Sequence, residues 1–360
     1  MRTLSALLPI LLSSAAVADT ITIKCDRDNT MYEEDVSLSN GAGNSIFSGT
    51  IASGDANRRA LLHFDLSAIP AGATVTSVTL ELTMNKTSTV NPVGVSLHRA
   101  TSDWGEGSSH ANGEEGGGAP AADGDATWGF TFFPDTKWTT LGGDFAGSAS
   151  ASTAVSVTGS YTWSGPGLVA DAQAWLDNPA SNFGWALKHD DETTAASAKR
   201  FGSRQATQAT ARPELIVEYS VACATVYCDS PSQLGDIAID TCDTAAGSIT
   251  LTSTGVTGGL FAYYNVAKGN GVVTDPPGSQ GDLCLVGGGS IGRYRNDLQS
   301  LGGTGTFSTD IWNSVSGGGG GGLPTPPGGS ILPGETWNFQ GWIRVNGGSR
   351  WTPALSASFI

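Results

Sequence analysis

Two neighbouring runs of alternating apolar and polar residues constrain this fold more than any other feature. In residues 59–66 and again in 78–84, every second residue is apolar, and Leu61 is the one apolar exception on the polar face. Pro70 and Gly72 lie between the runs. Side chains alternate across a strand, so each run predicts a strand with one buried face, and the Pro/Gly segment predicts a turn. Both apolar faces need a second layer, which predicts a sandwich. The residues expected inside are Ala60, Leu62, Phe64, Leu66, Val78, Leu80, Leu82 and Met84.

Residues 1–18 have the pattern of a secretory signal peptide. Arg2 precedes an apolar stretch at 4–12, and Ala16-Val17-Ala18 supplies a small-residue cleavage site. No later stretch approaches about 18 uninterrupted apolar residues, so we expect no membrane insertion. The chain is therefore predicted to be secreted and extracellular.

Composition narrows the range of partners. The chain carries 33 acidic against 18 basic residues, a formal net charge of −15. Such a surface repels phosphates, so nucleic acid is not expected as a partner. The 50 glycines and the low charged fraction of 14% fit many short strands joined by loops.

Five cysteines are consistent with an oxidising compartment. Cys25 stands alone, whereas Cys223, Cys228, Cys242 and Cys284 lie in the C-terminal part and allow three pairings. We favour Cys228–Cys242 among them. The spacing, with no nearby His, is a poor zinc pattern.

The rest of the first 220 residues supplies further strands and one helix. Alternation predicts strands at 93–99, 183–187 and 214–219, with an edge strand near 21–23. Apolar residues at helical spacing before Asn178-Pro179 predict a helix over 167–176. Residues 101–144 form a long excursion rich in Gly, acids and aromatics, and a loop of this length is usually functional or disordered. We assign Trp163, Trp175 and Trp185 to the core.

Several motifs in the correct order identify a family resemblance for residues 20–219. They are RRALLHFDLSAIPAGATVTSVTLEL, LHRATSDWGEGSS, GDATW, KWTTLGGDF, LVADAQAWLDNPASNFGWALK and ARPELIVEY. This segment resembles the DNRLRE-type secreted domain and is similar to carbohydrate-binding module family 96 and to disaggregatase-related repeats. The resemblance implies a jelly-roll β-sandwich with polysaccharide binding as its role.

Residues 221–360 are predicted to form a second module. Aromatic alternating strands are expected at 261–265 and 337–345, with a terminal strand at 353–360. The fold class is therefore all-β: an N-terminal jelly-roll sandwich with one short helix over 19–220, and a smaller C-terminal sandwich-like module over 221–360. No activity is assigned to the second module.

Two sets of side chains are candidates for ligand binding. Arg59, His63 and Asp65 share the outward face of one predicted strand, where all three could meet one ligand. Trp104, Trp128 and Trp138 in the excursion could stack on sugar rings. The alternatives are a solvated or loop-covered strand face for the first set and a satellite core under the loop for the second.

Charged residues supply two further hypotheses. Asp103, Glu106, Asp123 and Asp125 could offer oxygens to a structural calcium ion, although ordinary solvated acids are the alternative. An anionic sugar would need a local basic patch in this acidic chain. The candidates for that patch are Arg58, Arg59, Lys188, Arg200 and Arg204.

These observations predict a secreted, monomeric, non-catalytic protein that binds a polysaccharide or a cell-surface glycan. The sequence has no G-x-S-x-G, H-E-x-x-H or phosphate-cradling glycine motif, which disfavours an enzyme. The alternatives are a structural or adhesive surface protein without sugar affinity, or a polysaccharide-degrading enzyme.

Overall fold

The computed structural model describes residues 16–52, 56–287, 290–302 and 305–360. Residues 1–15 of the predicted leader therefore lie outside the described part of the chain. The chain divides into two compact units, Ala18–Ser220 and a unit that takes in Val221–Ile360. Among the described residues, no helix combines the length and the apolar character needed to cross a membrane.

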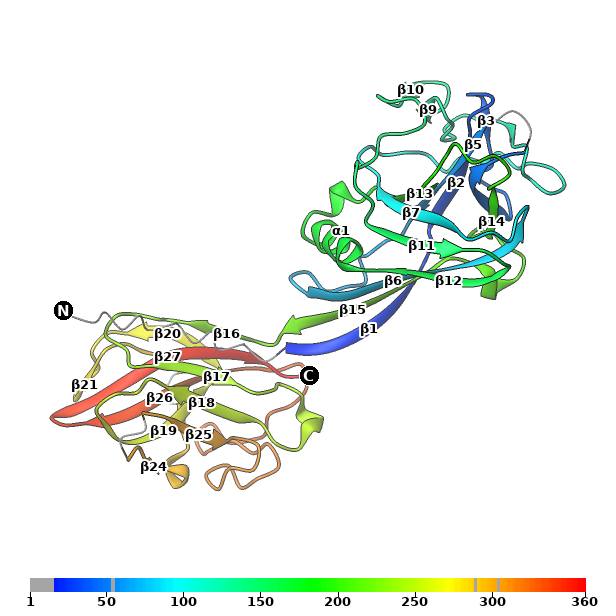
Figure 1. The fold of residues 1–360 in the computed structure, drawn as a ribbon. Coiled ribbons are helices and arrows are strands. Elements are labelled where there is room, and N and C mark those ends of the chain that lie inside the picture. Colours follow the sequence, from blue (N-terminus) through cyan, green and yellow to red (C-terminus); the bar gives the residue numbers. More distant parts are fainter. Residues whose placement is uncertain (1–15, 53–55, 288–289, 303–304) are drawn as a thin grey trace, which may run out of the picture. The chain divides into compact units, whose positions relative to one another are not determined.

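The first unit consists of two antiparallel sheets joined at strand β4, which pairs with β14 in one sheet and with β5 in the other. Most strands of both sheets are labelled in Figure 1. The first sheet contains β1 (Ala16–Lys24), β15 (Glu214–Ala222), β6 (Thr74–Thr87), β14 (Lys199–Gly202), β4 (Ser45–Thr50) and β12 (Gly159–Ser164). The second contains β4, β5 (Asn57–His63), β13 (Trp185–His189), β7 (Val93–Arg99), β11 (Ala151–Val155) and β2 (Arg27–Tyr32). The excursion adds two small pairs, β3 (Leu38–Ser39) with β8 (Ala119–Pro120) and β9 (Phe130–Phe132) with β10 (Thr136–Lys137). The prediction of an all-β fold is confirmed.

The core of this unit lies where the two alternating runs predicted it. Strands β5 and β6 belong to different sheets, and their inward residues, such as Leu62 and Leu80, are fully buried. Trp163, Trp175 and Trp185 are core residues, as predicted, and the rings of the last two lie 4.5 Å apart between centroids. Burial of such large rings contributes a major part of a core's hydrophobic stabilisation.

Helix α1 (Pro166–Asp177) confirms the helix predicted over 167–176. Pro166 stands in the first turn, where its missing N–H costs nothing, and Pro179 follows the end. The helix buries Leu168, Ala172 and Trp175 and packs against β6 and β11. Two short 3-10 turns, Pro179–Ser181 and Ala209–Ala211, complete the unit.

The second unit is also all-β. Its main sheet contains β16 (Ala224–Tyr227), β27 (Gly348–Ser358), β26 (Thr336–Val345), β19 (Gly259–Ala267), β23 (Gly292–Arg293), β21 (Ser279–Gln280) and β24 (Gln299–Ser300). A second sheet contains β17 (Asp236–Ile239), β18 (Thr250–Thr254) and β25 (Phe307–Asp310), and β20 (Gly269–Val273) pairs with β22 (Leu283–Val286). Two 3-10 turns lie at Thr244–Ala246 and Arg295–Asp297. The first two sheets enclose one core, in which the rings of Tyr264 and Phe307 stack at 4.6 Å.

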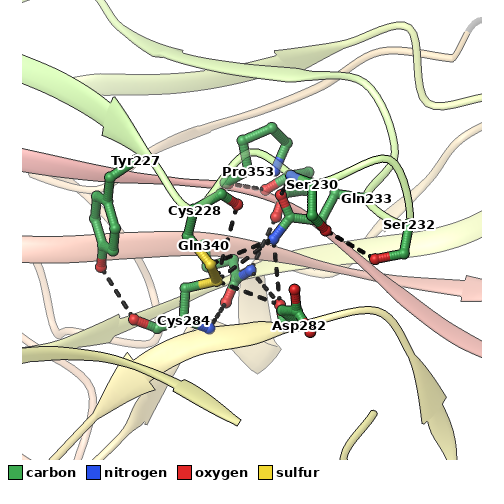
Figure 2. Close-up of a disulfide and its surroundings, with 10 residues drawn as sticks. Tyr227, Cys228, Ser230, Ser232, Gln233, Asp282, Cys284, Gln340 and Pro353 are labelled. Carbon is green, nitrogen blue, oxygen red and sulfur yellow. Dashed lines mark hydrogen bonds between the residues drawn. A yellow bond between two sulfur atoms is a disulfide. The ribbon is translucent and has the colours of Figure 1, made fainter. Parts of the chain in front are cut away.

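Two disulfides cross-link the second unit, and the predicted pairing Cys228–Cys242 is wrong. Cys223 pairs with Cys242, because the chain end hydrogen-bonds to both carbonyls: Ser358 N–H donates to Cys223 and Ile360 N–H to Cys242. The other bond joins Cys228 to Cys284 on β22 (Figure 2). Strand order, which spacing does not reveal, therefore decides the pairing.

The remaining cysteine gives a direct test that the other four cysteines are all oxidised. Cys25 is free and buried, and burial raises the pKa of its thiol well above the ordinary value. We expect no thiol to react in the native protein and one thiol to react after unfolding without reductant. Thiol titration of the wild type and of Cys25→Ser measures this, and the variant should give none in either state. Three or more thiols in the unfolded wild type would contradict the pairing.

Candidate functional site

A polar groove lies on the outer face of the second sheet of the first unit. Its volume is about 590 Å³. Its floor carries Arg59 from β5, Lys188 from β13 and His98 from β7, and the end of the excursion forms its wall. The wall residues are Thr101, Ser102, Thr139, Thr140, Leu141 and Gly143–Gly147. The alternation of β5 thus places one of the predicted ligand residues, Arg59, in a hollow that a ligand can enter.

Arg59 is held rigidly in this groove. Its Nε and Nη2 donate to the two carboxylate oxygens of Glu192 at 2.7 and 2.6 Å, and its Nη1 donates to the Gly142 carbonyl at 2.7 Å. The guanidinium also lies 4.5 Å from the centroid of the Trp128 ring. Gly142 has a φ of 87°, and a Cβ there would come within 2.6 Å of Arg59 Nη1. A glycine is therefore needed where the loop meets the arginine.

Lys188 lies beside this pair and is the less constrained cation. Its Nζ is 4.0 Å from a Glu192 oxygen that Arg59 already binds. Burial, and then the charge of Arg59, lower the pKa of Lys188 below its usual range. The pKa of Glu192 is lowered as well, since the hydrogen bonds and charge of Arg59 outweigh the effect of burial. The lysine therefore has unused hydrogen-bonding capacity that faces the groove.

Asp144 shapes the wall of the groove. Its carboxylate accepts from the N–H groups of Thr139 and Thr140 at 2.9 and 2.8 Å and from Ser102 Oγ at 3.2 Å. These bonds lower the pKa of Asp144 although burial opposes them. The loop that they fix leaves Leu141 exposed at the rim and the Phe145 ring half-buried.

The three loop tryptophans are not exposed, so the predicted stacking platform is wrong. Trp104, Trp128 and Trp138 are 0%, 4% and 6% exposed. They cover the apolar residues Leu61 and Ala186 on the outer face of the sheet, together with Met31 and Ala126. The indole N–H groups of Trp104 and Trp138 donate to the Phe183 and Thr127 carbonyls at 2.8 Å. The three tryptophans therefore form a satellite core under the loop, which was the alternative that the sequence left open.

The trio Arg59, His63 and Asp65 does not meet at one point. Leu61 lies between the first two on the same face and is buried under the tryptophans, which separates them. His63 Nδ1 lies 2.7 Å from Asp26 Oδ1, and both His63 and Asp65 line another hollow of about 290 Å³. Asp65 follows the end of β5 and accepts from the N–H and hydroxyl of Ser67 at 2.9 Å. It therefore closes a turn.

The four acids proposed to bind calcium do not converge on one point, because their surroundings differ. Asp103 accepts from Arg27 Nη1 at 3.1 Å, and Glu106 is bound by Arg204. Asp125 accepts from the N–H groups of Ser108 and Ala122 at 2.7 and 2.8 Å, and Asp123 is exposed. Within the described part of the chain, no group of three or more His, Cys, Asp or Glu is placed to hold a metal ion. These acids therefore do not form the predicted calcium site.

A buried polar cluster behind the groove-bearing sheet escaped the sequence reasoning. Asp28 is fully buried and accepts from the Arg204 N–H at 2.5 Å, while its Oδ1 has no hydrogen-bond partner among the described residues. Burial and the nearby charge of Glu106 raise the pKa of Asp28 to about 8, against the opposing bond from Arg204. The acidic run Asp26-Arg27-Asp28 was the available signal, because β2 begins at Arg27 and alternation turns Asp28 to the opposite, inner face.

Two antiparallel sheets with a polar groove on one outer face define a β-sandwich module. Residues 13–140 match the model of carbohydrate-binding module family 96. The match confirms the resemblance to that family, and the C-terminal module lies outside it. No curated protein matches the chain.

The buried carboxyl of Asp28 predicts how stability changes with pH. The folded chain keeps this proton up to a pH of about 8, whereas the unfolded chain releases it near about 4. The wild type therefore loses stability as pH rises through this window, and Asp28→Asn, which keeps an acceptor for the Arg204 N–H, does not. Between pH about 5 and about 8, the free energy of unfolding of Asp28→Asn should rise relative to that of the wild type by about 1 kcal/mol or more.

Urea unfolding at both pH values measures this difference. The control is Asp123→Asn, which removes an exposed carboxyl from the same unit. Parallel pH profiles for wild type and Asp28→Asn would show that Asp28 is not protonated in the folded chain.

Proposed function

We propose that this protein is a secreted, non-catalytic polysaccharide-binding protein whose first unit holds the glycan in the groove above β5 and β13. The family match supports carbohydrate as the ligand class. The groove supports the location, because its polar wall offers hydroxyl, carbonyl and amide groups at the scale of a few sugar rings.

The single observation that carries the proposal is the weak pairing of Lys188 with a carboxylate. The other four candidate cations are each engaged by a carboxylate: Arg58 by Glu34, Arg59 by Glu192, Arg200 by Glu114 and Arg204 by Glu106. Within the described part of the chain, the Lys188 side chain forms no hydrogen bond, and its one ion-pair contact is the 4.0 Å approach to Glu192. A sugar hydroxyl or carboxylate that enters the groove therefore gains a charge-assisted hydrogen bond without breaking an ion pair.

The carboxylates of the groove support a binding role over a catalytic one. Cleavage of a glycosidic bond needs a carboxylic acid with a raised pKa to protonate the leaving oxygen. The pKa values of Glu192 and Asp144 are both lowered by their hydrogen bonds, so both are poor proton donors at neutral pH. The function proposed is retention of the polymer without cleavage.

The leader-like first 18 residues and two disulfides support an extracellular location. Disulfides persist in oxidising compartments, where extracellular polysaccharides are also found. The proposal therefore places the protein and its ligand in the same compartment.

A glycan array probed with the full chain identifies the ligand, and calorimetry with Lys188→Ala then tests the groove. We expect the variant to bind the selected glycan about tenfold or more weakly, because one charge-assisted hydrogen bond is lost. Lys188→Arg should retain most of the affinity. No new reducing ends should appear during incubation.

Lys24→Ala is the matched control. It removes the same charge from β1, where Lys24 pairs with Glu214 outside the groove, and should leave affinity unchanged. Equal losses in Lys24→Ala and Lys188→Ala would mean that only overall charge matters. An array without any bound glycan would reject the proposal in favour of a structural surface role.

A further inference from the structure

The second unit carries a row of aromatic rings on the outer face of its main sheet. Tyr263 on β19 lies directly opposite Trp342 on β26, and the two rings are 4.9 Å apart between centroids with their planes 33° apart. Trp342 in turn lies opposite Trp351 on β27. Phe261, two residues before Tyr263, points to the same side and is 45% exposed. We call Phe261, Tyr263 and Trp342 the aromatic strip.

Alternation shows that this strip faces away from the core. Ala262, between Phe261 and Tyr263, and Ile343, next to Trp342, belong to the core cluster. Tyr264, also on the inner side, stacks on Phe307. The strip rings are therefore on the opposite face of the sheet, where Tyr263 and Trp342 remain half-buried and Arg344, opposite Phe261, is exposed.

The other end of this outer sheet face is covered by another segment, which limits the length of the aromatic strip. Gln340, two residues before Trp342, accepts from the Cys284 N–H at 2.8 Å and donates to the Asp282 carbonyl at 2.9 Å. The Cys228–Cys284 disulfide anchors this segment, and Figure 2 shows Gln340 against it. The β22 segment thus covers the face at Gln340 and leaves the aromatic end uncovered.

We propose that the aromatic strip is a second carbohydrate site, one that binds neutral β-linked pyranose chains. Pyranoses with equatorial hydroxyls present a flat face of C–H groups, which packs on aromatic rings. The Arg344 guanidinium at the edge supplies donors for the hydroxyl groups. The site differs from the groove in chemistry, since the groove is built around cations and hydroxyls and the strip around aromatic rings.

The size of the strip favours a sugar chain over a protein partner. Of its three rings only Phe261 is more than about one-third exposed. A stable protein interface buries roughly 1,000 Å² or more in total, far more than these rings offer. Two or three neighbouring rings match the length of a short oligosaccharide. This inference does not depend on whether the groove binds glycan.

Affinity electrophoresis of the full chain in gels containing hydroxyethylcellulose or xylan tests the strip. We expect retardation of the wild type and about tenfold weaker binding for Phe261→Ala/Trp342→Ala, as two stacking contacts are lost. Phe261→Ala alone, at an exposed position that folding tolerates, should give a smaller loss. Trp342→Phe, which keeps a ring, should retain most of the binding.

Two control variants test whether the retardation arises at the strip. Lys24→Ala, at an exposed ion pair of the first unit, and Val315→Ala, at an exposed apolar residue outside the strip, should both leave retardation by these neutral polymers unchanged. Wild type that is not retarded by either polymer would overturn the proposal, as would loss of retardation in Lys188→Ala but not in the strip variants. Sedimentation velocity supplies a last test: a dimer that the strip variants abolish would overturn the proposal, because the strip would then pack against a second copy.

Discussion

The packing of three indoles onto the outer face of β5 and β13 is the contact on which the first unit's functional surface depends. A sheet face that carried only polar residues would stay open to water, but Leu61 and Ala186 make part of this face apolar. Trp104, Trp128 and Trp138 cover that part, and each large side chain buried this way contributes roughly 1.5–3 kcal/mol. The excursion is held as a second layer by these rings, and the groove is the part of the face that they leave uncovered.

Cations connect the indole layer to the charge pattern of the groove. Arg27 lies 4.8 Å from the centroid of the Trp104 ring and Arg59 4.5 Å from that of Trp128, and each also binds a carboxylate. Both guanidinium groups are therefore used to hold the loop layer in place. In a chain with a net charge of −15, such pairing leaves little free positive charge. Attraction of an acidic ligand to the proposed groove would thus depend on the short-range field of Lys188, because salt screens charges beyond about 10 Å.

Local sequence patterns predicted the strands and the helix but could not predict the layer outside the sheet. Period-two alternation located Leu62 and Leu80 in the core, since a strand's buried face is a local property. Leu61 was the one apolar exception on the polar face, and the structure explains it as the point where the loop tryptophans attach. Whether a loop indole is covered or exposed depends on contacts with residues far away in the sequence. The same limit applies to the Cys223–Cys242 pairing, which the position of the terminal strand decides.

The two proposed sites recognise different features of a polysaccharide. In the two proposals, the groove offers a cation for an acidic or hydroxyl-rich substituent, and the strip offers aromatic rings for an apolar sugar face. Each contact by itself is weak, because binding of a sugar displaces water from polar groups on both partners. When one polymer occupies the first site, the second contact becomes intramolecular and its effective concentration rises. Under the two proposals, a polymer long enough to reach both sites would therefore be retained longer than by either contact alone.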